Sequence, residues 1–211
     1  MVRRKKYNEE KMVIISGFSG VGKGSVIHRL MEIDELVFKD QSKIWLSVSD
    51  TSRTMRNKED NYNFVSITDY QKRVNEGYYL EYNCYDENGY GTPREPVLDA
   101  LGKGETVILE IDRNGIEQIL SDEHLIDVDI FTIFICVNAN KLQARLLQRG
   151  DGKDDISRRM IIAYNELSHL SKYDHIFIND DIDKTALRVW ALIHGLPVSD
   201  DGFSEDLFYQ G

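Results

Sequence analysis

A glycine-rich turn near the start of the chain constrains its fold more than any other feature. Residues 17–23 read Gly-Phe-Ser-Gly-Val-Gly-Lys, after an apolar run at 12–16 and before a helical pattern at 25–33. In this context glycines let backbone N–H groups converge on a phosphate, and the lysine reaches its outer oxygens. The alternative is a strand–turn–helix unit that is glycine-rich for other reasons. The lysine at its expected place favours a phosphate-binding loop.

The residue after the lysine departs from the usual pattern of this loop. A serine or threonine normally stands there and binds Mg²⁺, but this chain has Gly24, and the nearest hydroxyl is on Ser25. Ser25 lies about 100° further round the helix, so it should not replace the missing ligand. We therefore expect a metal here to be held mostly by nucleotide oxygens and water.

Apolar runs and helical patterns alternate along the chain, which predicts an α/β fold with a mostly parallel sheet. Strands are expected at residues 12–16, 44–49, 105–111, 129–137 and 175–178, and helical spacing recurs at 156–170 and 182–193. Between residues 50 and 92, aromatic and β-branched residues cluster between polar turns, which indicates an inserted β-rich lobe. The polar stretch 148–155 separates two helical patterns and predicts a mobile lid.

Composition excludes several classes of function. The net charge is −10, which disfavours non-specific binding to nucleic acid because phosphate neutralisation needs a basic face. Apolar runs such as 133–137 fall far short of the ~18 residues that a membrane span needs, and no signal peptide is expected. The two cysteines, Cys84 and Cys136, form no CxxC pair, which predicts reduced thiols in a cytoplasmic protein.

Charged residues elsewhere suit a phosphate acceptor. An apolar strand at 107–111 carries Glu110 and is followed by Asp112, where ligands bind in α/β sheets, although such acids also cap the next helix. No nucleophile–base constellation is evident. A kinase whose acceptor is itself a phosphate instead needs cations that bring two polyanions together. Arginines in predicted loops and helix ends suit this role, although each can also be a solvated surface charge: Arg53, Arg56, Arg145, Arg149 and Arg159.

At this point several segments match one family in order and spacing. They are GFSGVGKGS (17–25), SVSDTSRTMR (47–56), YNFVS (62–66), YLEY (79–82), YGT (90–92), LEIDRNG (109–115), ARLLQRG (144–150) and INDDID (178–183). Over residues 12–194 the chain resembles guanylate kinases. The resemblance implies a P-loop nucleoside monophosphate kinase fold, with a five-stranded parallel core sheet flanked by helices, an inserted β-rich GMP-binding lobe and a short helical lid.

The resemblance also implies domain boundaries. The core would comprise residues 12–49 and 93–194, including the lid at 145–159, and the GMP-binding lobe would comprise 50–92. Residues 1–11 and 195–211 would be terminal tails. The last seven residues look like a viral-protease tag site with its aromatics transposed, so we expect part of the second tail to be added sequence outside the fold.

The resemblance assigns roles to the matching positions. The ATP-binding residues would be Gly17, Phe18, Ser19, Gly20, Val21, Gly22, Lys23, Gly24 and Ser25, with Asn179 near the adenine. The GMP phosphate would be held by Ser49, Arg53, Arg56, Tyr62 and Tyr90, and the guanine by Glu81, Thr92 and Asp112. The catalytic residues would be Lys23, Arg53, Arg145, Arg149 and Arg159. Aromatic residues in a β-rich lobe usually pack, so the two tyrosines have a purely structural alternative.

The expected activity is phosphoryl transfer from ATP to GMP, and to dGMP, with Mg²⁺ as cofactor and only indirect metal contacts from Glu110 or Asp112. One alternative is a non-catalytic guanylate-kinase-like module that binds peptides. The intact Lys23 favours the enzyme, since such modules typically have degraded phosphate loops. A second alternative is a monophosphate kinase with a different acceptor. Glu81 and Asp112 argue against it, because adjacent donors on guanine suit carboxylates and adenine lacks that pair.

Overall fold

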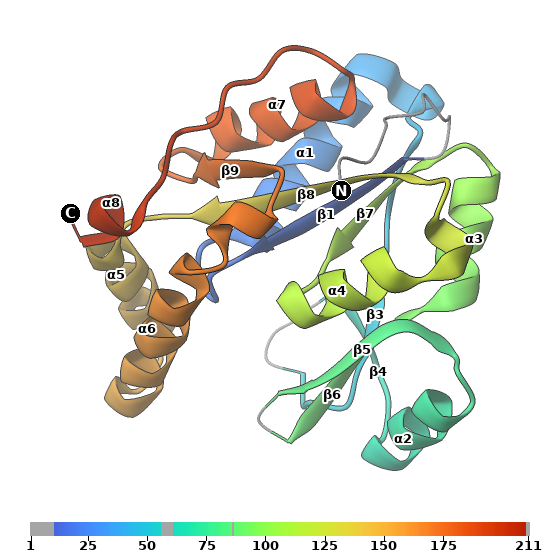
Figure 1. The fold of residues 1–211 in the computed structure, drawn as a ribbon, viewed down its shortest axis with the longest axis horizontal. Coiled ribbons are helices and arrows are strands. Elements are labelled where there is room, and N and C mark those ends of the chain that lie inside the picture. The colour runs from blue at the N-terminus through green and yellow to red at the C-terminus, as the bar shows by residue number, and fades with distance from the viewer. Residues whose placement is uncertain (1–10, 56–60, 86, 210–211) are drawn as a thin grey trace. The chain divides into compact units, whose positions relative to one another are not determined.

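The computed structural model describes residues 11–55, 61–85 and 87–209 (Figure 1). It confirms the predicted five-stranded parallel sheet, whose strand order is β2-β7-β1-β8-β9. These strands are β1 (Lys11–Gly17), β2 (Ile44–Leu46), β7 (Thr106–Glu110), β8 (Asp129–Cys136) and β9 (His175–Ile178). Their continuous apolar runs are typical of parallel strands covered on both faces, and Ile14, Ile108 and Ile133 are fully buried.

A second, four-stranded sheet forms in the predicted β-rich region, in the order β4-β3-β6-β5. It contains β3 (Ser49–Thr51), β4 (Tyr62–Phe64), β5 (Tyr79–Tyr85) and β6 (Asn88–Pro93). β3 pairs parallel with β4 and antiparallel with β6, and β5 pairs antiparallel with β6. The single strand predicted at 44–49 is wrong: β2 ends at Leu46 in one sheet and β3 begins at Ser49 in the other. The pattern at 44–49 stays compatible with a strand throughout, so it does not reveal a change of partner strand.

Helices fill the connections between the strands. They are α1 (Lys23–Phe38), α2 (Ile67–Asn75), α3 (Arg94–Gly102), α4 (Arg113–Ser121), α5 (Ala139–Arg149), α6 (Lys153–Leu167), α7 (Ile182–Ile193) and α8 (Glu205–Tyr209), with 3₁₀ turns η1 (Lys39–Gln41), η2 (Glu123–Leu125) and η3 (Leu170–Lys172). Side-chain caps fix several starts: Asp112, Asn138 and Asp181 each accept a backbone N–H three residues on. Within the described residues, no helix is both long and apolar enough to cross a bilayer.

The chain divides into two compact units. One comprises Lys43–Ile130 together with the start of β1 up to Met12, and the other comprises Val13–Ser42 and the chain from Phe131 onward. The lobe boundaries expected at 50 and 92 both fall inside the first unit, which also contains β2, β7, α3 and α4.

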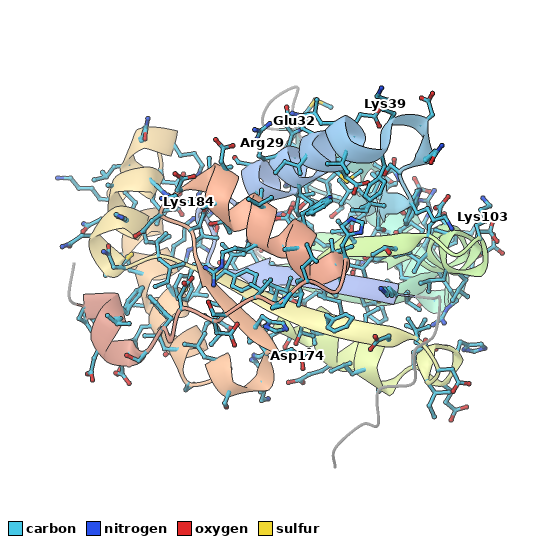
Figure 2. The ribbon with its side chains drawn as sticks, turned by 90° about the horizontal axis from the view of Figure 1, so that it is seen from above. Arg29, Glu32, Lys39, Lys103, Asp174 and Lys184 are labelled. Carbon is cyan, nitrogen blue, oxygen red and sulfur yellow. The ribbon has the colours of Figure 1, made fainter. Side chains whose placement is uncertain are left out.

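Within the second unit, α1 and α7 lie side by side (Figure 1). On the surface, Arg29 of α1 pairs with Glu32 and with Asp183 at the start of α7, and Figure 2 labels Arg29 and Glu32 next to each other on α1. Beneath it, the buried Asp34 accepts hydrogen bonds from Ser42 Oγ at 2.5 Å and Trp190 Nε1 at 2.8 Å, and its carboxylate lies 3.1 Å from His194 Nε2. A buried carboxylate is tolerated only with such partners, so this network fixes the two helices to each other.

The end of the chain was expected to lie outside the fold, but residues up to Tyr209 are part of it. Glu205–Tyr209 form the short helix α8, and Phe203 and Phe208 are buried. The polar, aperiodic sequence after α7 gave no helical signal, because a five-residue helix is too short to show a period.

Candidate active site

The predicted phosphate loop lies between β1 and α1 in the second unit. Gly17 has a φ of 147°, and a Cβ at this position would lie 2.1 Å from the carbonyl oxygen of Ile135, so no other residue fits. Gly22 caps α1 in the left-handed conformation. Lys23 Nζ donates to the carbonyl oxygens of Gly17 at 3.1 Å and Phe18 at 3.4 Å. The loop therefore curls around the lysine ammonium group and holds it beside the N-terminus of α1, where backbone N–H groups favour an anion.

A pocket of about 320 Å³ adjoins this loop. The residues lining it include the expected ATP residues Gly20, Gly22, Ser25 and Asn179, together with the expected catalytic arginines Arg145 and Arg149. They come from the loop, α1, α5 and the end of β9, and the structure brings them together within one unit. Gly24 and Ser25 lie exposed in the first turn of α1.

Asn179 carries an unused acceptor in this pocket. Its side chain is fully buried, and its Nδ2 donates to the carbonyl oxygen of Val21 at 2.9 Å. Among the described residues its Oδ1 has no hydrogen-bond partner. Arg145 fixes the same region by donating to the carbonyl oxygens of Val21 at 2.6 Å and Asn179 at 2.8 Å. A buried orphan acceptor is costly, so it is a natural place for a donor on a ligand.

Two arginines from neighbouring helices share one carboxylate. Arg149, at the end of α5, pairs with Asp151, and Arg159 of α6 contacts the same carboxylate at 3.2 Å. Arg159 also donates to the hydroxyl of Ser19 in the phosphate loop. A guanidinium fork binds phosphate as readily as carboxylate, so phosphate oxygens can take the place of Asp151 on both arginines.

The first unit holds a separate polar cluster between paired strands. Glu81 on β5 lies opposite Thr92 on β6, and Thr92 Oγ1 donates to Glu81 Oε1 at 2.5 Å. The hydroxyls of Ser49 and Thr92 lie 3.2 Å apart, which extends the chain to β3. Glu81 is 4% exposed. Burial raises its pKa to about 7, with a further increase from the charge of Asp112, against the opposing hydrogen bond from Thr92.

Two residues that the sequence reasoning missed shape this cluster. Asn83 Nδ2 donates to Asp112 Oδ2 at 2.6 Å, while Asp112 Oδ1 accepts the N–H of Gly115. A Cβ at Gly115 would lie 2.5 Å from Glu81 Oε2, so only glycine leaves room for that carboxylate. Strand alternation places Asn83 on the same face as Glu81, and this signal could have found it. Asp112 therefore caps α4 and also faces the cluster, so the two alternatives considered for it, a helix cap and a residue of a binding site, are compatible.

In the part of the expected GMP site that would hold the phosphate, an arginine packs against aromatic rings. Arg53, 9% exposed, lies with its guanidinium 5.0 Å from the ring centroid of Tyr62 and donates to the carbonyl oxygen of Thr54. The rings of Tyr62 and Tyr90 pack edge to face at 6.0 Å. Both tyrosines thus pack, as their structural alternative expected, and Tyr62 also contacts the arginine. Arg56 lies outside the described residues.

The expected metal contacts stay predictions. Glu110 is half-buried at the end of β7. Both carboxylate oxygens of Asp112 already accept hydrogen bonds, from Gly115 N–H at the start of α4 and from Asn83 Nδ2. In residues 11–55, 61–85 and 87–209, no three His, Cys, Asp or Glu side chains gather into a metal-binding cluster.

Comparison with known proteins places this geometry in a family. A family model described as guanylate kinase matches residues 9–195. The chain is 34% identical over 190 residues to a guanylate kinase of Prochlorococcus marinus, covering 88% of this chain and 98% of that protein. It is 37% identical over 186 residues to a guanylate kinase of Alkalilimnicola ehrlichii, covering 86% of each. A crystal structure of guanylate kinase from Anaplasma phagocytophilum aligns with a TM-score of 0.68 at 25% identity, covering 88% of this chain and 85% of that one. The chain belongs to the guanylate kinase family.

Proposed function

We propose that this protein transfers the γ-phosphoryl group of ATP to GMP, giving ADP and GDP, and that it accepts dGMP as well. The observation that carries the proposal is the hydrogen-bonded chain from Ser49 through the buried residues Thr92 and Glu81, in a protein that also has an intact phosphate loop. Guanine presents N1–H and an exocyclic amine as adjacent donors, which one carboxylate accepts together, and its O6 accepts from a hydroxyl. Adenine lacks the donor pair and would leave Glu81 unpaired.

The pocket beside the phosphate loop is the proposed ATP site. The free acceptor of Asn179 suits the exocyclic amine of adenine, and the loop N–H groups with Lys23 suit the phosphates. Arg145 would hold the rim of this pocket through Val21 and Asn179. A hydrogen bond from the adenine amine to Asn179 Oδ1, together with phosphates on the loop, would fix both ends of the nucleotide and so its orientation.

We propose Mg²⁺ as the cofactor, bound together with ATP. Gly24 has no side chain, and Ser25 is exposed in the first turn of α1, so that turn offers the ion only the hydroxyl of Ser25. This donor set fits an ion carried mainly by nucleotide oxygens and water, with indirect help from Glu110 or Asp112. When bound, Mg²⁺ neutralises charge on the β- and γ-phosphates.

The remaining work falls to cations of this chain. The attacking GMP phosphate oxygen is already anionic, so no general base is required. Lys23 would bind the transferring phosphoryl group, and Arg149 and Arg159 would exchange Asp151 for phosphate oxygens. Arg53, Arg56, Tyr62 and Tyr90 would hold the GMP phosphate. Residues 50–92 would be the GMP-binding lobe and residues 145–159 the lid.

A coupled assay of ADP formation across acceptors tests the proposal. With ATP and Mg²⁺, we expect turnover with GMP and dGMP, and rates with AMP, UMP and CMP lower by about 10⁴, because a site built to pair polar groups rejects bases that leave them unpaired. Comparable rates with AMP would contradict guanine recognition by Glu81. No ADP with any acceptor would favour the peptide-binding alternative.

A further inference from the structure

The segment 196–209, here called the C-terminal strap, lies beyond the family match, which ends at residue 195. Its first part covers the edge of β9. Asp201 Oδ2 accepts the N–H of Ile178 at 2.7 Å, Asp200 Oδ1 accepts that of Ile176 at 3.4 Å, and Arg188 of α7 pairs with Asp201. An uncovered edge strand leaves unpaired N–H groups, so these carboxylates hold the strap to the sheet.

The second part of the strap ends on the phosphate loop. Phe208 of α8 is 1% exposed and Phe18 of the loop is 3% exposed. Their rings pack edge to face with centroids 5.4 Å apart. The ring of Phe18 also packs against that of Phe134 on β8, with centroids 5.1 Å apart. The aromatic ring of the loop is thus held between a strand of the sheet and the strap.

The backbone of Phe18 belongs to the proposed ATP site. Its carbonyl oxygen accepts the N–H of Val21 at 3.2 Å and lies 3.4 Å from Lys23 Nζ. Anchoring the Phe18 ring therefore fixes the turn that surrounds Lys23. Without the ring of Phe208, Phe18 would lose one wall of its pocket, and close-packed interiors do not refill such a space freely.

The strap also contacts the helices that carry the lid arginines. α8 packs near α5, as Figure 1 shows, and the ring of Tyr209 lies 6.0 Å from that of Tyr164 on α6. The charge of Glu205 on α8 raises the pKa of Tyr164. One short helix therefore touches the phosphate loop, α5 and α6, all within the second unit.

We propose that Phe208 is a positioning residue that holds the phosphate loop in its ATP-binding conformation through Phe18. This inference rests on the proposed ATP site. Binding to a loop that is competent only part of the time weakens affinity by the competent fraction, so a loop ordered ~10% of the time binds ATP about tenfold more weakly. Saturating ATP restores the ordered loop, so kcat should stay near its wild-type value. The GMP residues lie in the other unit, so the KM for GMP should not change.

The test compares three variants of the full-length chain. Phe208→Ala removes the ring, Phe208→Leu keeps an apolar side chain in its place, and Phe203→Ala removes another buried ring of the strap that is not part of the Phe18 cluster. ATP affinity is measured by calorimetry without GMP, and steady-state kinetics give the KM for each nucleotide and kcat. Reversible general unfolding would weaken the binding of both nucleotides by the same folded fraction, and irreversible unfolding would lower kcat alone. A disordered phosphate loop differs from both, because it raises only the KM for ATP.

We expect Phe208→Ala to weaken ATP binding about tenfold and Phe208→Leu about threefold, with kcat retained and Phe203→Ala like the wild type in ATP affinity. Wild-type ATP affinity in Phe208→Ala, or equal losses in Phe208→Ala and Phe203→Ala, would overturn the inference. If Phe208→Ala does not fold, Phe208→Leu carries the test, and wild-type affinity there overturns it. A wild-type protein that binds no ATP would overturn the proposed function together with the inference.

Discussion

Glu81 gives the most discriminating prediction, because burial raises its pKa and favours the protonated carboxyl, whereas its proposed role needs the ionised carboxylate. Its folded pKa of about 7 lies above its ordinary value of 4.5. A carboxylate with a raised pKa stabilises the folded state at low pH, where it is protonated, and this stability is lost as the pH rises from 4.5 through 7. Since one pKa unit corresponds to 1.36 kcal/mol, the loss is about 3 kcal/mol.

Guanine binding needs the opposite state. The two guanine donors pair with the ionised carboxylate, which is ~90% populated at pH 8 and ~10% populated at pH 6 if the pKa is about 7. We therefore expect kcat/KM for GMP to lose about tenfold through Glu81 between these pH values. The KM for ATP should not follow this change.

Glu81→Gln is the matched control. It replaces a charged hydrogen bond worth about 1.5–3 kcal/mol, so at pH 8 kcat/KM for GMP should fall by about ten- to a hundredfold. At pH 6 the wild type is mostly protonated, and the ratio between wild type and variant should shrink about tenfold. Titration of the GMP phosphate affects both proteins and cancels in the ratio.

Two assays over pH 5–8 check this reasoning: initial rates at limiting GMP, and urea unfolding of both proteins. The variant should lack the part of the wild-type stability loss that comes from Glu81, so at pH 8 it should be at least as stable as the wild type while less active. A wild-type to variant ratio that stays flat from pH 6 to 8, with parallel stability curves, would refute the account of Glu81.

Three further substitutions test other parts of the structure. Lys23→Met should lower kcat at least ~100-fold, because the negative charge of the transferring phosphoryl group is no longer stabilised by the lysine. Steady-state kinetics measure the loss, and circular dichroism checks that the protein is folded. Asn83→Ala should raise the KM for GMP about fivefold while kcat and the KM for ATP hold, since Asp112 loses a donor worth about 1 kcal/mol; an unchanged KM would remove Asn83 from the site. Asp34→Ala should lower the free energy of unfolding by about 3 kcal/mol in urea titrations, because it strands the buried partners of that carboxylate; a loss below ~1 kcal/mol would contradict the role given to the network.

The parallel core was predictable because its strands are buried on both faces and so appear as continuous apolar runs. The phosphate loop was predictable for a similar reason: glycine spacing, the preceding strand and Lys23 are all local in sequence. The split between β2 and β3 was not, since residues 44–49 are compatible with one strand, whereas the structure divides them between two sheets.

Contacts between distant residues were the part that sequence could not supply. Strand alternation can place Asn83 on the face of Glu81, but Asn83 reaches Asp112 across 29 positions, and nothing near either residue marks that pairing. Phe208 lies in a segment without periodicity, yet it packs on Phe18, because a single ring can fill a pocket without any repeating pattern. Such contacts depend on the assembled fold and leave no local signal.

The central claim is that one phosphoryl group passes from ATP directly to GMP in a reaction that depends on Lys23. ATP labelled at its γ-phosphate, incubated with Mg²⁺, GMP and the full-length protein, tests it in one measurement. We predict that the label appears in the β-phosphate of GDP, that little appears as inorganic phosphate, and that Lys23→Met nearly abolishes the transfer. Label released only as inorganic phosphate, or equal labelling of GDP by the Lys23→Met protein, would contradict the account.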